Sequence, residues 1–230
     1  MKVDAILFDK DGTLFDFAAT WNVWAGAIIT ETAGGDVATA QRVADALRYD
    51  LGAASFRPDS PVIAGTNRDA AELIVSALPD WSLEAMEELL MQRAAAVPQM
   101  PAIELVPFLD GLRARGLALG VMTNDTEFAA RAHLDRAGVL DQFDMVIGFD
   151  SGYGAKPDAA PLLAFANAQG HAPGRVAMVG DSTHDLIAGR AAGMICIGVL
   201  TGPARAKELA PFADQVFPDI GHLADWLDPA

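Results

Sequence analysis

Two acids follow a short apolar run near the start of the chain. Residues 3–8 form that run, and Asp9 and Asp11 come next, with a glycine and a threonine directly after them. In an extended backbone, alternate side chains share one side, so both carboxylates would point one way and Lys10 the other. Neighbouring acids repel each other, and their natural partner is a divalent cation that prefers oxygen. Taken alone, the stretch also fits an ordinary Asp-Gly turn.

Three later stretches carry side chains suited to binding ions. Thr123 and Asn124 precede an expected helix start, where a hydroxyl and backbone N–H groups can bind an anion. A simple helix cap is the alternative there. Lys156 lies in a glycine-rich loop, where a solvated lysine is the ordinary interpretation. Asp181 and Asp185 are spaced to share one face of a helix start, although acids also commonly cap helices.

An alternation of strands and helices would position these side chains. Helices are expected at about 102–115, 126–137, 158–169 and 182–192, each ending at a glycine, and strands at 117–122, 145–149, 175–179 and 194–199. This alternation indicates an α/β fold, a Rossmann-like doubly wound parallel sheet that also includes the strand at residues 3–8. In such sheets ligands bind at the carboxyl ends of the strands, where all four polar stretches would lie.

The segment between the first strand and this alternation is expected to be wholly helical. Trp21 and Trp24 belong to an apolar stripe that runs to about Gly34, and both are expected in a core. Further helices are expected at 37–47, 67–78 and 82–97, with a proline-containing loop over residues 53–65. We therefore predict an α/β core domain of residues 1–15 and 98–230, interrupted by a helical cap domain of residues 16–97.

In their order and placement, the four polar motifs resemble those of the haloacid dehalogenase (HAD) superfamily. The matching residues are Asp9-Lys10-Asp11-Gly12-Thr13, Thr123-Asn124, Lys156 and Gly180-Asp181-Ser182-Thr183-His184-Asp185. The resemblance covers residues 1–15 and about 98–230, and residues 16–97 are similar to the helical cap that this family inserts after its first strand. Lys10 departs from the family, many of whose members carry an apolar residue there, and its side chain is expected to point away from the chemistry.

The resemblance implies Mg²⁺-dependent phosphoryl transfer. Asp9 would attack phosphorus to form an aspartyl phosphate, while Asp11 would protonate the leaving oxygen and later take a proton from water. The Asp9 carboxylate, the Asp11 backbone carbonyl and Asp181 would hold Mg²⁺, supported by Asp185. The residues implied to hold the substrate phosphate are Thr123, Asn124 and Lys156. Dehalogenases of this family lack the second acid, so Asp11 indicates phosphoryl transfer.

We therefore predict a phosphatase of small phosphomonoesters, closest in layout to phosphoglycolate phosphatases. The alternatives are a phosphomutase of the β-phosphoglucomutase kind and a non-catalytic phospho-signalling module like a response-regulator receiver. Specificity is expected from the loop at residues 53–65 and the helix start after it, where Arg57 and Arg68 could bind a carboxylate or a second anionic group. In the other interpretation, the two arginines pair with nearby surface acids such as Glu72.

The charge and cysteine content of the chain limit the classes of molecule that it is expected to bind. A formal net charge of -15 argues against binding nucleic acid or an anionic membrane, and favours a small phosphorylated metabolite as the partner. Cys196 is the single cysteine, so no internal disulfide can form, which fits a reducing compartment. No apolar stretch approaches the ~18 residues of a membrane span. We expect a cytoplasmic monomer or homodimer, with His133 at the surface and His184 in a structural role.

Overall fold

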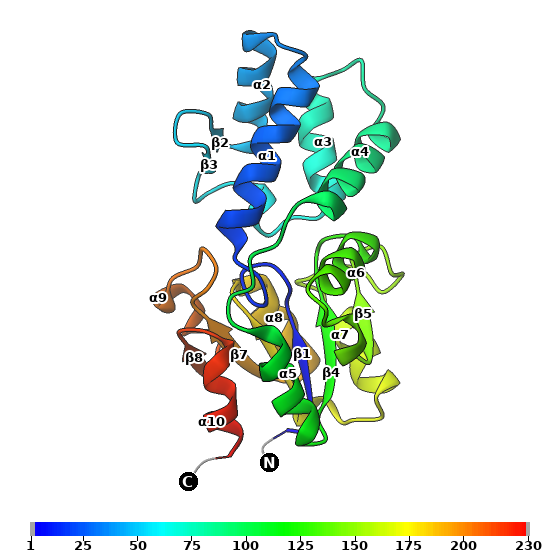
Figure 1. Ribbon diagram of the computed structural model, residues 1–230, viewed down its shortest axis with the longest axis vertical. Coiled ribbons are helices and arrows are strands. Elements are labelled where there is room, and N and C mark those ends of the chain that lie inside the picture. Colours follow the sequence, from blue (N-terminus) through cyan, green and yellow to red (C-terminus); the bar gives the residue numbers. More distant parts are fainter. Residues whose placement is uncertain (1–2, 229–230) are drawn as a thin grey trace.

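The computed structural model describes residues 3–228, and a parallel sheet forms the centre of its α/β part (Figure 1). The strands follow the order β5-β4-β1-β6-β7-β8, and all neighbouring pairs are parallel. Their bounds are β1 Ala5–Phe8, β4 Ala118–Met122, β5 Met145–Ile147, β6 Val176–Gly180, β7 Ile195–Val199 and β8 Gln215–Phe217. The central strands are apolar along almost their whole length because helices cover both faces. The predicted fold class is confirmed.

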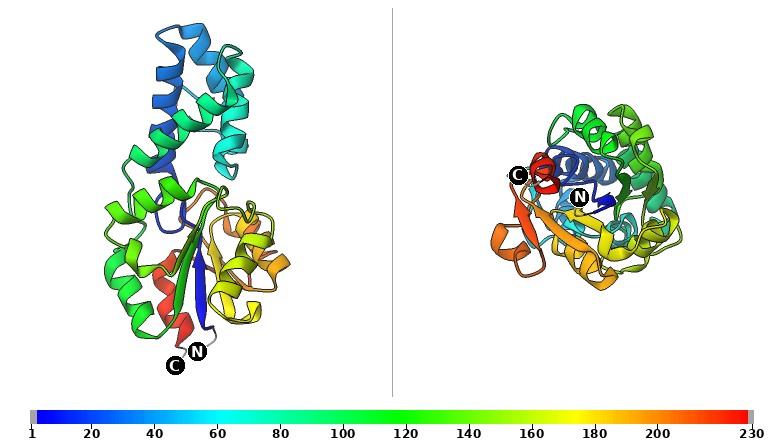
Figure 2. Two further views of the ribbon diagram at one scale, coloured as in Figure 1. Left: turned by 90° about the vertical axis from the view of Figure 1, so that its right-hand side faces the viewer. Right: turned by 90° about the horizontal axis from the view of Figure 1, so that it is seen from below.

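Helices cover the two faces of this sheet (Figure 2). They are α5 Leu105–Ala114, α6 Glu127–Arg136, α7 Ala160–Ala168, α8 Thr183–Ala192, α9 Ala206–Leu209 and α10 Leu223–Leu227, with short 3-10 turns at Leu140–Gln142, Pro173–Arg175 and Ile220–His222. Apolar residues of α5, α6 and α10 pack with one face of the strands, and those of α7 and α8 with the other. Because strand faces alternate, β1 contributes Ile6 and Phe8 to the first cluster and Leu7 to the second.

The segment from residue 16 to residue 97, which we call the helical insertion, lies beyond the carboxyl ends of the strands (Figure 1). Its helices are α1 Phe17–Ala33, α2 Val37–Leu47, α3 Asn67–Ala77 and α4 Leu83–Ala96, with a 3-10 turn at Pro61–Ile63. They pack around an apolar cluster that includes Trp24, Ile28 and Leu90, and whose buried members all belong to the insertion apart from Ala129 of α6. Separate apolar clusters support dividing the chain into an α/β core and a cap, and this division stays a proposal.

Two differences from the sequence-based expectation concern short elements. The helical insertion is not wholly helical, because β2 (Tyr49–Asp50) and β3 (Ser55–Phe56) form an antiparallel pair. Strands of two residues are too short to show an alternating pattern. The elements β8, α9 and α10 were not predicted either, since each has only three to five residues. Within residues 3–228, no helix has the length and apolar character needed to span a membrane.

Candidate active site

The centre of the site is an ion-pair cluster at the carboxyl ends of β1 and β6. Asp9 directly follows β1, and its carboxylate lies 2.5 Å from the Lys156 ammonium nitrogen. The same nitrogen lies 2.6 Å from a carboxylate oxygen of Asp185 and donates to the backbone carbonyl of Met122 at 2.9 Å. All three charged residues are buried. Burial alone would lower the pKa of Lys156, but the two carboxylates raise it above its ordinary value.

Three buried carboxylates converge at this point. One oxygen from each of Asp9, Asp181 and Asp185 lies within 4.8 Å of the others. Burial raises the pKa of Asp9 to about 7, and Asp185 and Asp11 add to the shift while Lys156 opposes it. The pKa of Asp181 is also well above its ordinary value, because of burial and repulsion from the same acids. A single lysine does not balance these charges, so the donor set fits a divalent cation with oxygen ligands, such as Mg²⁺.

Two glycines make room for Asp181, which follows β6. A Cβ atom on Gly202 would lie 1.6 Å from the nearest carboxylate oxygen of Asp181, and one on Gly12 would lie 2.4 Å from that oxygen. Gly12 also has a positive φ of 84°, a conformation that disfavours other residues. Thr13 contacts the Asp181 carboxylate at 3.5 Å. Gly202 gave no signal in the sequence, because its role depends on a segment far from it along the chain.

Asp185 both caps a helix and contributes to the site. One carboxylate oxygen accepts hydrogen bonds from the backbone N–H and hydroxyl of Ser182, at 3.0 and 2.7 Å, within a capping box at the start of α8. Its other oxygen pairs with Lys156. The two sequence interpretations, a helix cap and a site acid, therefore describe the same side chain. The Asp185 side chain also lies against the backbone of Gly180. A Cβ atom added to Gly180 would lie 2.4 Å from that side chain, so a larger residue does not fit there.

Thr123 and Asn124 lie beside the ion pairs but make different contacts. The buried Thr123 hydroxyl lies 3.5 Å from the Asp11 carboxylate and accepts the backbone N–H of Asp125 at 3.1 Å. The Asn124 amide donates to the backbone carbonyls of Lys156 and Ala64, each at 2.9 Å, and accepts the Lys156 N–H. Asn124 thus fixes the loop that carries Lys156 and joins it to the helical insertion.

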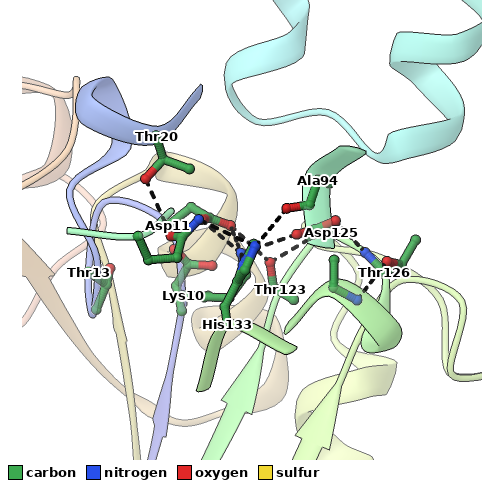
Figure 3. Close-up of polar contacts among 12 residues, drawn as sticks. Lys10, Asp11, Thr13, Thr20, Ala94, Thr123, Asp125, Thr126 and His133 are labelled. Carbon is green, nitrogen blue, oxygen red and sulfur yellow. Dashed lines mark hydrogen bonds and ion pairs between the residues drawn. The ribbon is translucent and has the colours of Figure 1, made fainter. Parts of the chain in front are cut away.

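Lys10 contacts the second acid of the first motif (Figure 3). Its side chain is fully buried, with the ammonium nitrogen 2.9 and 2.8 Å from the two carboxylate oxygens of Asp11. The same nitrogen lies 3.1 Å from Asp125 and 3.0 Å from Nδ1 of His133. The prediction that Lys10 points away from the chemistry is therefore wrong. Burial lowers the pKa of Lys10, but Asp11 and Asp125 outweigh burial and leave it raised.

His133 is fully buried, which corrects the expectation of a surface histidine. Helix α6, which carries His133, packs against α4 of the insertion. The face of α6 that we expected to be exposed is therefore covered. The His133 Nε2 atom lies 2.8 Å from the backbone carbonyl of Ala94, and Nδ1 faces the Lys10 ammonium. Burial and Lys10 lower the pKa of His133 to about 4, so the neutral ring accepts from Lys10 and donates to Ala94.

A cavity of about 80 Å³ separates the strand ends from the helical insertion, and a wider cleft of about 1340 Å³ adjoins it. The residues predicted to act in catalysis, to bind phosphate or to hold the metal all line the cavity, and His184 lines both spaces. They are Asp9, Asp11, Thr123, Asn124, Lys156, Asp181 and Asp185. Arg57 and Arg68 are exposed and line neither of them. Arg68 instead pairs with Glu72 and Glu87, each at 3.2 Å, which corresponds to the surface alternative. The structure does not bring these arginines to the strand ends, and their role in specificity stays a prediction.

Comparisons with known proteins place the chain in a family. Residues 3–193 match the model of the haloacid dehalogenase-like hydrolases, and the chain belongs to this family. A phosphoglycolate phosphatase of Rhodospirillum rubrum is 40% identical over 119 residues, a match that spans about half of each chain (52% and 49%). One of Xylella fastidiosa is 32% identical over 86% of this chain and 80% of its own. The predicted enzyme class, a hydrolase of the phosphatase type, agrees with these names.

A solved structure supports the fold independently. The crystal structure of a predicted phosphoglycolate phosphatase from Haemophilus somnus superposes with a TM-score of 0.73, covering 99% of both chains at 19% identity. At this identity the likeness shows the fold alone. The substrate must therefore be argued from the site itself.

Proposed function

We propose that the chain is a Mg²⁺-dependent phosphatase that hydrolyses small phosphomonoesters through an aspartyl phosphate formed on Asp9. The observation that carries the proposal is the pairing of the Asp9 carboxylate with Lys156 inside a cluster of buried acids. Asp11, which follows Asp9 by two residues, lines the same cavity and could exchange protons with a leaving group there. The names of the relatives and the net charge of -15 also favour a small phosphorylated metabolite over nucleic acid.

In this proposal, two steps replace one difficult hydrolysis. A carboxylate oxygen of Asp9 forms a bond to phosphorus as the ester bond breaks, and Asp11 gives its proton to the leaving alkoxide. Asp11 then takes a proton from water, whose oxygen attacks phosphorus and releases Asp9. Lys156 and the Thr123 hydroxyl would hold the phosphoryl oxygens throughout.

The residues that would hold Mg²⁺ are Asp9, Asp181, the Asp11 backbone carbonyl and, directly or through a neighbour, Asp185. When bound, Mg²⁺ would neutralise negative charge on the phosphoryl group and on the acids around it. The donor set fits this ion because all the ligands are oxygens and the carboxylates exceed the nearby positive charge. We also propose that the enzyme is cytoplasmic, which its single cysteine supports, and that it is a monomer or homodimer.

Release of inorganic phosphate tests the proposal. A phosphatase transfers the phosphoryl group to water, so we expect steady phosphate release from a panel of phosphomonoesters with Mg²⁺ and without any sugar bisphosphate. A phosphomutase would instead require a bisphosphate and would return the phosphate to the sugar, and a signalling module would not turn over. Release that depends on a bisphosphate, or no release from any ester, would contradict the proposed function.

A further inference from the structure

The helical insertion presents an apolar surface to the cavity. Phe17, Trp21 and Trp24 of α1 line it, together with Val62 and Ile63 of the 3-10 turn. The acids and Lys156 line the same cavity, so a phosphate bound to them would leave the rest of the substrate beside these side chains. The part of a substrate that extends beyond its phosphate would therefore contact aromatic and aliphatic carbon.

The same surface lacks positive charge. Of the described residues, those that the insertion contributes to the cavity include no lysine, arginine or histidine. Two of its polar side chains there are engaged, since the Thr66 hydroxyl donates to Asp69 at 2.7 Å and the Asn67 amide donates to the Glu87 carbonyl at 3.1 Å. The indole N–H groups of Trp21 and Trp24 have no protein partner in the part of the chain that the structure describes, and they are donors without charge. In the wider cleft, the insertion adds Asp69 and Glu72, which are both acids.

The basic groups near the substrate all come from the α/β core. Among the described residues that line the two spaces, they are Lys156, His184 and Arg205, and Lys156 is already paired with Asp9 and Asp185. A carboxylate on the leaving group would lose its hydration against aromatic rings and meet no cation from the insertion. An uncharged apolar group would gain from burial against the same rings.

From this surface we propose that the enzyme acts on phosphomonoesters whose alcohol part is uncharged and largely apolar, and disfavours small esters that carry a carboxylate. The inference rests on the proposed phosphatase function and adds a substrate class to it. It also separates this chain from relatives whose names specify phosphoglycolate, a phosphate ester whose alcohol part carries a carboxylate.

Three esters test this class: benzyl phosphate, phosphoglycolate, and phosphoglycolamide, in which an uncharged amide replaces the carboxylate. With saturating Mg²⁺, we expect kcat/KM for benzyl phosphate and for phosphoglycolamide to exceed that for phosphoglycolate by at least about tenfold. All three leaving groups are alkoxides, so the comparison reports mainly on the remote group. A kcat/KM for phosphoglycolate equal to or above the other two would overturn the inference and leave the proposed function standing. If none of the esters is hydrolysed, the proposed function fails and the inference with it.

A matched pair of variants tests the cause. Ile63 is half-buried and lines both spaces. Ile63→Arg would supply the missing cation, so we expect the ratio of kcat/KM for phosphoglycolate to that for benzyl phosphate to rise at least about tenfold. Ile63→Gln, which is polar but uncharged, should raise the ratio far less. Equal ratios in the two variants would show that charge at this wall does not set specificity, and would overturn the inference.

Lys10 carries a second, independent inference, because it is the strongest contact of the Asp11 carboxylate. Asp125 and His133 contact the Lys10 ammonium at 3.1 and 3.0 Å (Figure 3). The Trp21 ring of the insertion lies 5.3 Å from the same ammonium. We infer that Lys10 is a positioning residue that holds Asp11 where it can exchange a proton with the leaving oxygen. Lys10 contacts Asp11 in the core and lies near Trp21 of the insertion, so the position of the Asp11 carboxylate would depend on the position of the insertion.

The dependence on leaving group distinguishes positioning from a merely structural role. A poor leaving group such as the benzyl alkoxide needs the Asp11 proton, whereas 4-nitrophenolate leaves without it. In Lys10→Met we therefore expect kcat/KM to fall roughly 100-fold for benzyl phosphate and less than about tenfold for 4-nitrophenyl phosphate. The ratio kcat/KM is the right quantity because it reports the steps up to formation of the phosphorylated enzyme.

Lys10→Met leaves the buried Asp125 carboxylate without its partner, so the variant could fail to fold. The double variant Lys10→Met with Asp125→Asn removes the pair together, and we expect the same difference between the two esters in it. Thermal denaturation shows which of these variants is folded. Equal losses of kcat/KM for both esters in a folded variant would overturn the positioning role.

Discussion

Replacing Asp9 by asparagine is expected to abolish phosphate release while leaving the fold intact. An amide cannot attack phosphorus. Loss of the nucleophile costs on the order of 10⁶-fold in rate in a serine protease, so we expect at least about a 10⁴-fold loss here. The fold should tolerate the change because the amide oxygen can still accept a hydrogen bond from Lys156. Burial already raises the pKa of Asp9 to about 7, so a neutral side chain suits this position at least as well as a charged one.

The measurement is phosphate release by the purified variant, with mass spectrometry to exclude deamidation back to aspartate. Its Tm in chelator should equal or exceed that of the wild type, since one of three mutually repelling acids has become neutral. Asp141→Asn is a matched control, because Asp141 is an exposed acid of the turn Leu140–Gln142, away from the site. Activity near the wild-type level in Asp9→Asn would rule out Asp9 as the nucleophile.

Ligands in parallel α/β sheets bind at the carboxyl ends of the strands, and this tendency explains how much of the site could be predicted. Asp9, Lys156 and Asp181 are far apart in the chain, but each follows a strand or precedes a helix at the same edge of a parallel sheet. Their convergence therefore follows from the order of the elements. The residues that close around them could not be found in this way. Gly202 matters only because its backbone passes against the Asp181 carboxylate, and no local pattern reports such an approach.

The errors on Lys10 and on His133 have different physical causes. Lys10 was placed opposite the acids by strand alternation, but a long flexible side chain can turn back toward a neighbouring carboxylate. The burial of His133 depends on α4 packing over α6, a contact between distant parts of the chain. Arg57 and Arg68 have the right chemistry for an anion and are exposed, and their role in specificity stays a prediction.

Mg²⁺ is expected to stabilise the protein more strongly as the pH rises. Burial places the pKa of Asp9 at about 7 and raises that of Asp181, against ordinary values of 3.8. A folded-state pKa above the unfolded value means that the stabilising contribution of the group is complete below about pH 4. It is then lost as the pH rises through the folded pKa, which for Asp9 is about 7. The metal-free protein should therefore lose stability across that window.

Mg²⁺ binds the deprotonated carboxylates, so the increase in Tm that it causes should grow across the same pH window and level off above it. At about 100 times its Kd, a bound ion adds about 2.7 kcal/mol, or roughly 5–10 °C in Tm for a chain of this size. Thermal denaturation with chelator and with Mg²⁺, at several pH values, measures both trends. Asp181→Asn should weaken the pH dependence, because it removes one of the two raised pKa values. A Tm increase that does not change with pH, or full activity in excess chelator, would mean that these acids do not hold the ion on which the chemistry depends.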